Sequence, residues 1–522
     1  MKAWGKSIQR AALAAVLTLS FGAAATAEDM KGGTLVWGKP NDVDSFDVHV
    51  ATNGVTWQVL FLVYETLIEP KGDFTFEPLL AESWEQPSPT TYVFHLRQNA
   101  KFSNGRSVTA DDVVKSLNRL RDPEIGSFWA RQTGPITEIV ADDAHTVRIE
   151  LERPYSPLLA ALSSVNASII PFEELEAGTF DVTKEMLGSG PFMVAEHLQN
   201  ESWTLQRNPH YWREGHPVVD EVKILVIPDD AARIGALRDG RVHIANFDNP
   251  DTPVLLAGAP NVSTVVQQTT DYYRIDVQAL PDRGSPFADE RVRQAMVLGL
   301  DRQKISDIAL AGTAAVDYPV PAAFPSSAAC HDIPSYQEPR SARVEKAKML
   351  LAEAGAEGVE VGFVASPTVP VFPLIAQVIA DSLKDIGMAV NVEAVPRGEW
   401  LERAFVTGEF DMAMSWFAGY TDPVMVPAWW DPDFAVWNGQ FMLKDEALTA
   451  LLEQAKETAP GAERDALFGE ICSAIDAQAN MVALVGKPAI VAYREDQVRP
   501  RIHEAEGYVN HFKYIEEYVL LN

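Results

Sequence analysis

The histidines and cysteines are the residues best able to supply catalytic or metal-binding chemistry, and their spacing supports neither. The 10 histidines are scattered, and no two form a His-x3-His or His-Glu-x-x-His arrangement, which would place two metal ligands on one helix face. The sequence contains no Cys-x-x-Cys, no Gly-x-Ser-x-Gly and no Gly-x4-Gly-Lys-Ser/Thr phosphate loop. Among 73 acidic residues, no pair is marked out for acid–base work. These patterns predict a protein that is not an enzyme and holds no cofactor or metal.

An aromatic-rich segment is the strongest indication of a binding site. Aromatic faces can stack on sugar rings, aromatic groups or apolar side chains of a ligand, but they also build protein cores. Both interpretations stay open for each residue, and we expect two or three of them to line a cleft. Arg397, upstream, is either a partner for a ligand carboxylate or a solvated loop charge. The segment contains Trp416, Phe417, Tyr420, Trp429, Trp430 and Trp437.

The first residues have the composition of an export signal. Lys2, Lys6 and Arg10 form a basic region, residues 11–21 are apolar, and residues 25–27 supply the small side chains of a cleavage site. No cysteine follows the apolar stretch, so a lipid anchor is not expected. The sequence therefore predicts a signal peptide over residues 1–27 and a periplasmic location.

The rest of the chain has the length and charge of a large acidic protein. Without the predicted signal peptide, 495 residues remain, which is enough for at least two domains. They carry 40 Lys and Arg against 73 Asp and Glu, a formal net charge of −33. Nucleic acids and anionic membranes need a basic surface, so neither is an expected partner. We also expect the protein to be a monomer.

Two cysteines, Cys330 and Cys472, could pair in an oxidising compartment. Their distance in space cannot be inferred from the sequence, so a disulfide and two free thiols both stay open. One bridge in a chain of this length would be an accessory to a large core.

Periodic patterns alternate between strands and helices. Residues 92–97 alternate as a strand, and Thr109 with Asp112 resembles a capping box for a helix through Leu120. Further on, the patterns predict a fold of the α/β class. They indicate helices over 344–351, stopped by Gly355, and 374–386, stopped by Gly387, then a strand over 388–394, a helix over 400–405 and a strand over 410–417.

Blocks spread along nearly the whole chain resemble the family 5 extracellular solute-binding proteins, the periplasmic dipeptide- and oligopeptide-binding components of ABC importers. Each block alone is weak, and their common order carries the resemblance. The blocks are KGGTL (31–35), VYETL (63–67), PLLAESW (78–84), TYVFHLR (91–97), KFSNG (101–105), TADDV (109–113), GSGPF (188–192), RNPHYW (207–212), PFADERVRQA (286–295), AKMLLAEAG (347–355) and FDMAMSW (410–416).

The resemblance implies a two-lobed periplasmic-binding-protein fold of type II, in its large three-domain variant. The first lobe would combine residues 28–72, 188–276 and 486–522. An accessory domain would occupy residues 73–187, and the second lobe residues 277–485. Crossovers near 276 and 485 would form a hinge, and a ligand would be enclosed between the lobes.

The resemblance also implies where the ligand lies. One segment is 50–54 in the first lobe, including Thr52, Asn53 and Gly54. The other is 416–420 in the second lobe, including Ala418. Backbone amides would hold the solute as in strand addition, while roomy pockets accept its side chains.

Peptide-binding relatives carry, three residues after the tryptophan, an aspartate that pairs with the peptide ammonium. Gly419 stands there in this sequence. Asp422 matches another acidic position of the family, which we interpret as a turn residue while keeping it among the candidate ligand residues. A buried ammonium without its carboxylate is costly, so the sequence leaves open whether the ligand is a peptide.

The expected function is capture of a peptide or peptide-like solute and its delivery to the permease subunits of an ABC importer. One alternative is a non-peptide ligand, such as an oligosaccharide or an opine-like conjugate. A periplasmic chaperone or sensor subunit is a further alternative. An exported hydrolase would need a coherent catalytic group, which the sequence does not provide.

Overall fold

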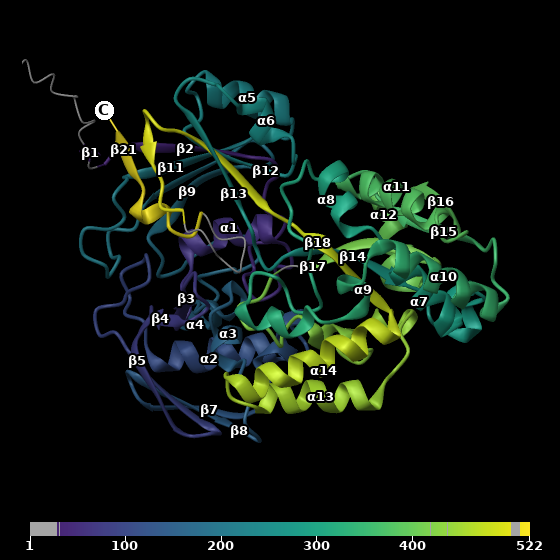
Figure 1. The fold of residues 1–522 in the computed structure, drawn as a ribbon. Helices are drawn as coiled ribbons and strands as arrows, with labels where there is room; N and C mark the ends of the chain where they lie inside the picture. Colours follow the sequence, from purple (N-terminus) through teal and green to yellow (C-terminus); the bar gives the residue numbers. More distant parts are fainter. Residues whose placement is uncertain (1–28, 31, 418, 436, 503–511, 522) are drawn as a thin grey trace, which may run out of the picture.

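The chain folds into two α/β lobes that lie side by side (Figure 1). The computed structural model describes residues 29–30, 32–417, 419–435, 437–502 and 512–521. The predicted signal peptide, residues 1–27, lies outside the described residues. None of the helices in the described part of the chain combines the length and apolar character that a membrane crossing requires.

The first lobe is built on a seven-stranded mixed sheet in which β2 pairs in parallel with both β11 and β12. Leu35 and Trp37 of β2 are fully buried. Because β2 and β12 run in the same direction, Lys39 and Asp248 lie at the same edge, at the carboxyl ends of these strands. The strand order is β13 (Val262–Gln267), β19 (Ala489–Arg494), β12 (Ile244–Phe247), β2 (Thr34–Lys39), β11 (Glu221–Val226), β10 (Ser202–Arg207) and β9 (Phe192–Leu198).

Helices and short strands complete the first lobe. Helix α1 (Gly54–Val63) is almost wholly buried, and α5 (Asp230–Arg238) and α6 (Thr252–Leu256) lie at the far end of the lobe (Figure 1). A small sheet joins the two ends of the described chain, with the order β1 (Asp29–Met30), β21 (Val519–Leu521) and β20 (Val498–Arg499).

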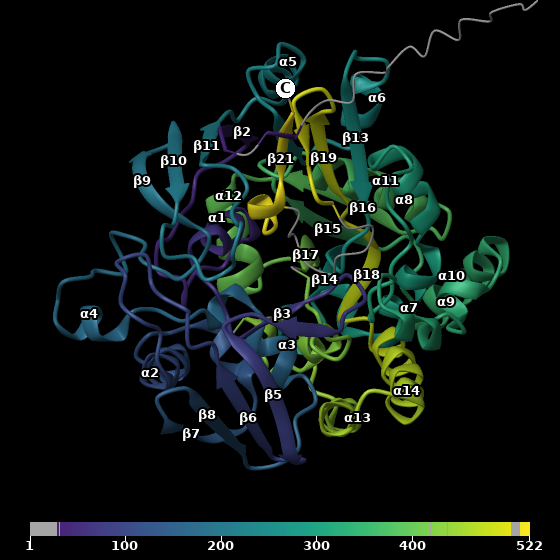
Figure 2. The ribbon, with the colours of Figure 1, turned by 90° about the vertical axis from the view of Figure 1, so that its left-hand side faces the viewer.

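The accessory domain carries a four-stranded antiparallel sheet at the end of the molecule opposite α5 and α6 (Figure 2). Strand β6 alternates as predicted, with Tyr92, Phe94 and Leu96 buried. These residues share one core with the apolar side of α2 (Ala110–Arg121), which begins at the predicted capping box. The sheet order is β5 (Ala81–Ser88), β6 (Thr91–Leu96), β8 (Thr146–Leu151) and β7 (Ile136–Asp143). Beside the sheet lie the hairpin of β3 (Ile68–Pro70) and β4 (Phe76–Pro78) and the helices α3 (Leu158–Leu162) and α4 (Phe172–Glu176).

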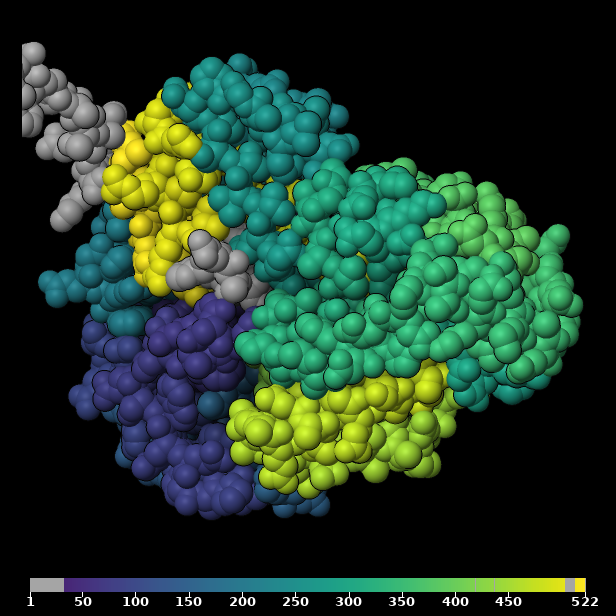
Figure 3. Space-filling view, in the orientation of Figure 1, coloured from purple at the N-terminus to yellow at the C-terminus, as the bar shows by residue number. Residues whose placement is uncertain are grey.

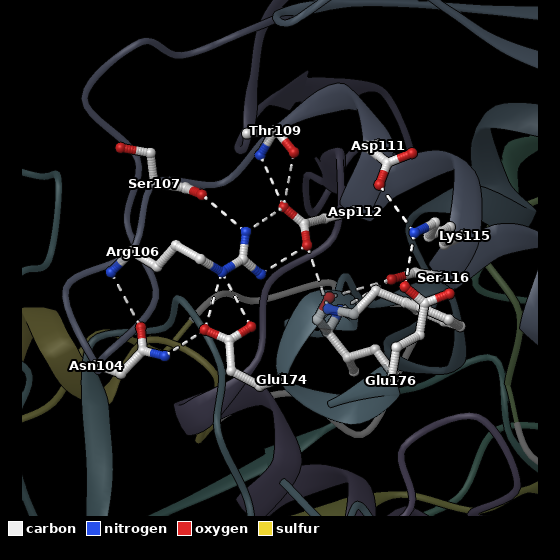
Figure 4. A network of polar contacts seen from close by, with 12 residues as sticks. Asn104, Arg106, Ser107, Thr109, Asp111, Asp112, Lys115, Ser116, Glu174 and Glu176 are labelled. Atoms are coloured by element: carbon white, nitrogen blue, oxygen red, sulfur yellow. Dashed lines mark hydrogen bonds and ion pairs between the residues drawn. The ribbon is translucent and has the colours of Figure 1, made fainter. Parts of the chain in front are cut away.

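The family blocks at residues 101–113 have a structural explanation in a network around Arg106 (Figure 4). Its guanidinium binds both carboxylate oxygens of Asp112, at 2.7 and 2.9 Å, and its Nε binds Glu174 at 2.9 Å. Asp112 also accepts hydrogen bonds from the amide and hydroxyl of Thr109. The network joins α2 and α4 to the loop that carries Arg106 and precedes α2. The residues of these blocks therefore stabilise the accessory domain.

The second lobe is built on a five-stranded sheet in which β14 and its neighbour at the sheet edge, β18, are buried on both faces. Its order is β16 (Ala389–Ala394), β15 (Glu360–Ala365), β17 (Met412–Phe417), β14 (Tyr272–Val277) and β18 (Met481–Gly486). Helix α11 (Val371–Lys384) packs on β15, β16 and β17. The other helices are α7 (Glu290–Gly299), α8 (Arg302–Ala309), α9 (Pro334–Gln337), α10 (Arg340–Ala354), α12 (Arg397–Leu401), α13 (Glu446–Glu457) and α14 (Ala462–Gln478).

The elements predicted for the second lobe are confirmed. Gly355 ends α10 with a φ of 67°, a conformation that suits glycine. Helix α11 ends at Lys384, slightly before the predicted stop at Gly387. The short helix predicted over 400–405 spans α12 and a π-helical turn, Glu402–Thr407.

The two crossovers between the lobes lie at residues 268–271 and 487–488, between β13 and β14 and between β18 and β19. The predicted second boundary, between residues 485 and 486, lies beside the second of these crossovers. The first lies earlier than the predicted boundary at 276, which would cut through β14. The prediction was wrong because β14 continues the chain of β13 without a turn signal, and only its pairing with β17 and β18 assigns it to the second lobe.

The accessory domain and the second lobe are in contact, so this structure is closed on that side. Arg153 bonds Glu453 at 2.6 Å and Glu457 at 2.8 Å, and the amide of Ser156 donates to the carbonyl of Lys456 at 2.7 Å. In Figure 3 the yellow-green surface of α13 and α14 meets the blue and purple accessory domain. One apolar core runs through both units.

Cys330 and Cys472 form a disulfide with a Cα–Cα distance of 5.5 Å, which resolves the alternative left open by the sequence. Both residues are fully buried, and the bridge ties α14 to the segment before α9.

Candidate functional site

The first candidate segment, residues 50–54, forms the entry to α1. Asn53 caps this helix, because its Oδ1 accepts the amide of Thr56 at 2.9 Å, and its Nδ2 donates to Asp44. Ala51 is buried, whereas the Thr52 side chain is exposed. The segment therefore offers Thr52 and the backbone around Gly54, while the side chain of Asn53 is already engaged.

Trp416 is the penultimate residue of β17 and keeps 36% of its surface exposed. Its ring is nearly parallel to that of Trp400, with centroids 6.1 Å apart, and its other neighbour is Phe372 at 5.5 Å. A ring that packs on neighbouring aromatic rings and keeps part of its surface exposed can stack on a planar or apolar part of a ligand.

The remaining aromatic residues of the segment are mostly core. Phe417 and Trp430 are buried and pack on each other at 5.6 Å. The hydroxyl of Tyr420, 3% exposed, accepts Trp429 Nε1 at 2.8 Å. Trp437 is half-buried against Trp429 and makes no hydrogen bond through Nε1 within the described residues. Packing therefore explains most of these side chains, in line with the interpretation of this segment as protein core.

Ala418 lies outside the described residues, and the next residue, Gly419, is buried. Its amide donates to a carboxylate oxygen of Asp271, a residue of the first crossover. Asp271 is 3% exposed, and burial raises its pKa to about 6. A carboxylate thus reaches the position where this sequence lacks the family's aspartate, but it comes from the hinge.

Two lysines, Lys487 and Lys39, lie near the acidic groups at the hinge. Lys487 on the second crossover lies 3.7 Å from Asp248 and also attracts the carboxylate of Asp271. Burial lowers the pKa of Lys39, at the end of β2, to about 7, and its ammonium donates to the carbonyl of Asn41 at 3.3 Å. The edge of the first sheet and both crossovers therefore meet in one charged junction.

Sequence reasoning missed this junction. The spacing of Asp271, Lys487 and Lys39 carries no motif. The one available signal was their place beside the predicted hinge.

Asp422 and Arg397 have different surroundings. Asp422 is buried, binds Arg464 through both carboxylate oxygens and accepts the amide of Val424 at 2.9 Å. These contacts agree with the turn interpretation of Asp422. Arg397 is exposed at the start of α12, and no bond joins its guanidinium to the described residues.

A cavity of about 320 Å³ lies between the accessory domain and the second lobe. Its polar lining includes Arg131, which donates to the carbonyl of Phe434 at 2.9 Å, and the buried Gln132. Met425 lines both this cavity and a smaller one beside Tyr420. The described residues contain no group of three or more His, Cys, Asp or Glu able to hold a metal ion.

Two lobes joined by paired crossovers define the fold of a solute-binding protein of the two-lobed periplasmic type. The chain belongs to the bacterial extracellular solute-binding proteins, family 5, whose model matches residues 75–436. Members of this family are ligand-binding components of ABC importers and not enzymes.

Three relatives illustrate the match. The periplasmic oligopeptide-binding protein OppA of Salmonella typhimurium is 27% identical over 507 residues, covering 90% of this chain and 91% of the relative. The structure of DppA from Helicobacter pylori in complex with the peptide STSA has a TM-score of 0.78 and 25% identity, covering 94% and 99% of the two chains. The structure of AgaA from A. tumefaciens R10 in complex with agropinic acid has a TM-score of 0.79 and 24% identity, with the same coverage.

Proposed function

We propose that this protein captures a peptide or peptide-like solute between its lobes in the periplasm and delivers it to the permease of an ABC importer. The observation that carries the proposal is a pair of lobes joined by two crossovers, with the partly exposed segment 52–54 at the start of α1 in the first lobe and the partly exposed ring of Trp416 in β17 of the second. The similarity to OppA over most of both chains supports the peptide class. The acting unit would be a monomer, because one chain supplies both lobes.

Thr52, the backbone of Asn53 and Gly54, and Trp416 would contact the solute in this proposal. Arg397, exposed and without a partner in the described chain, would meet a ligand carboxylate. The backbone groups of Ala418 and Gly419 would also bind the solute. Phe417, Tyr420, Asp422 and Trp437 would support the site through packing.

A second candidate is a non-peptide solute, such as an opine-like conjugate. Gly419 has no side chain to hold a ligand ammonium, and the nearby Asp271 already accepts the Gly419 amide and faces Lys487. AgaA, a protein of the same fold, is described in complex with agropinic acid. The fold therefore accommodates more than one ligand class.

The test is titration calorimetry of the exported protein with Ala-Ala-Ala, its N-acetylated form and an amino acid–sugar conjugate. The proposal predicts saturable binding of the tripeptide without turnover. If only the conjugate binds, the second candidate is correct. If none of the three binds and native mass spectrometry finds no small molecule carried from the cell, capture of this solute class is refuted.

A further inference from the structure

The first crossover is bonded to the second crossover. The hydroxyl of Thr269 donates to the carbonyl of Lys487 at 2.9 Å, and the amide of Lys487 donates to the carbonyl of Asp271 at 2.8 Å. The two strands of the hinge therefore move together. Since the first crossover holds the second through both backbone and side chain, bending of one requires bending of the other.

The same crossover also holds the segment that follows β17. The pairing of β14 with β17 ends at Tyr272 and Phe417, and among the described residues that follow, Gly419 and Tyr420 have no ladder partner in β14. Beyond Phe417, side chains of the first crossover bind the backbone in place of ladder hydrogen bonds. The carboxylate of Asp271 accepts the amide of Gly419, and the hydroxyl of Thr270 donates to the carbonyl of Tyr420 at 3.0 Å.

Burial makes these two bonds costly to lose. Thr270 is fully buried and Asp271 is 3% exposed, so a group that loses its partner there is not rehydrated. The bond from Gly419 is charge-assisted when Asp271 is ionised, which makes it stronger than a neutral bond. The segment after Trp416 is thus attached to the hinge by bonds at two consecutive residues.

We propose that Thr270 and Asp271 are positioning residues of the ligand site, which attach the segment 419–420 to the hinge so that lobe closure and placement of this segment are one motion. The inference rests on the proposed function, because it concerns the same ligand segment. It adds that the crossover, and not the second lobe alone, determines where that segment lies.

The test uses hydrogen–deuterium exchange of the full-length mature protein without ligand. Thr270→Val removes the donor to Tyr420, and Asp271→Ala removes the acceptor of Gly419. We expect peptides that cover residues 418–421 to exchange about five- to tenfold faster in either variant, while β15 and β16 are unchanged. Asp271→Asn keeps an acceptor oxygen and should restore most of the protection.

Thr66→Val is the matched control, because Thr66 is buried and donates to the carbonyl of Ile68 at 2.7 Å, away from the hinge. Exchange of residues 418–421 that stays at the wild-type rate in folded Thr270→Val protein would overturn the proposal. Acceleration spread evenly over the second lobe would do so as well, because it would indicate a general loss of stability.

The measurement needs no ligand, so its outcome is separate from the proposed function. Failure of Ala-Ala-Ala to bind the wild-type protein would count against peptide capture and leave the attachment of the segment standing. If the tripeptide binds, Thr270→Val should raise its Kd about fivefold or more. An unchanged Kd together with faster exchange would refute the positioning role.

Discussion

The ring of Trp129 in the accessory domain stacks on the ring of Tyr420 in the second lobe, with centroids 5.5 Å apart and planes at 24°. The two residues are far apart in the sequence and belong to different units, yet both are almost fully buried. The contact places Tyr420, in the segment proposed to hold the ligand, between the hinge on one side and the accessory domain on the other. Closure of the molecule therefore buries Tyr420 and leaves Trp416 as the more accessible ring.

This difference in exposure predicts different losses of stability for two substitutions. Tyr420→Ala removes a buried ring and should lower the free energy of unfolding by about 3 kcal/mol. Trp416→Ala removes a half-open ring and should cost about 1 kcal/mol in stability while weakening ligand binding. Thermal unfolding and calorimetry on both variants check this. Equal loss of stability in the two variants would contradict the assignment of Trp416 to the cleft surface.

The contacts of Arg153 predict how the closed state is held. Arg153→Ala breaks the ion pairs with Glu453 and Glu457 that join the accessory domain to the second lobe. These groups are partly exposed, so the loss is about 1 kcal/mol or less, which is still enough to raise the open fraction several-fold. Small-angle scattering of the ligand-free variant should show a larger radius of gyration. Lys184→Ala, which breaks an exposed pair with Asp181 inside the accessory domain, should leave the radius unchanged.

The disulfide predicts sensitivity to reductants. Cys330 and Cys472 are 142 residues apart in the sequence, so their bridge removes considerable freedom from the unfolded chain. Reduction should therefore lower the free energy of unfolding by about 2–5 kcal/mol. Denaturant unfolding with and without dithiothreitol measures this loss, and the double variant Cys330→Ala/Cys472→Ala should not respond to dithiothreitol. An equal response of the double variant would show that the reductant acts elsewhere.

Glu65 predicts a pH-dependent contribution to stability. Burial raises its pKa to about 7, above the value of 4.5 expected in the unfolded chain. The native state therefore binds the proton more tightly between about pH 4.5 and 7, and the contribution of Glu65 to stability falls as the pH rises through that window. Above pH 7 the ionised form costs on the order of 3 kcal/mol.

Glu65→Gln tests this, because the amide oxygen can still accept Trp212 Nε1, which now donates to Glu65 at 2.9 Å. The variant should gain stability relative to wild type as the pH is raised from 5 to 8. Unfolding in denaturant at several pH values gives the difference. A difference that stays constant with pH would show that Glu65 does not titrate in this range.

Three elements of the accessory domain and the second lobe show how far local patterns reach. The capping box at Thr109, the stop at Gly355 and the alternation of residues 388–394 are all short-range signals, and each element formed as predicted. The fold class and the family followed from such signals and from blocks of residues in a shared order. These properties depend on neighbours in the chain, so the sequence by itself determined them.

Contacts between distant segments were decided only by the tertiary structure. Strand β14 joins the second lobe through its pairing with β17 and β18, and no residue within it marks that choice. Asp271 meets Gly419, and Lys487 meets Asp248, because the crossovers bring distant parts of the chain together. Burial then raises the pKa of Asp271. It also leaves Trp416 more exposed than the buried aromatic residues of its segment. Burial and charge at these positions are properties of the packed molecule, so no spacing in the sequence encodes them.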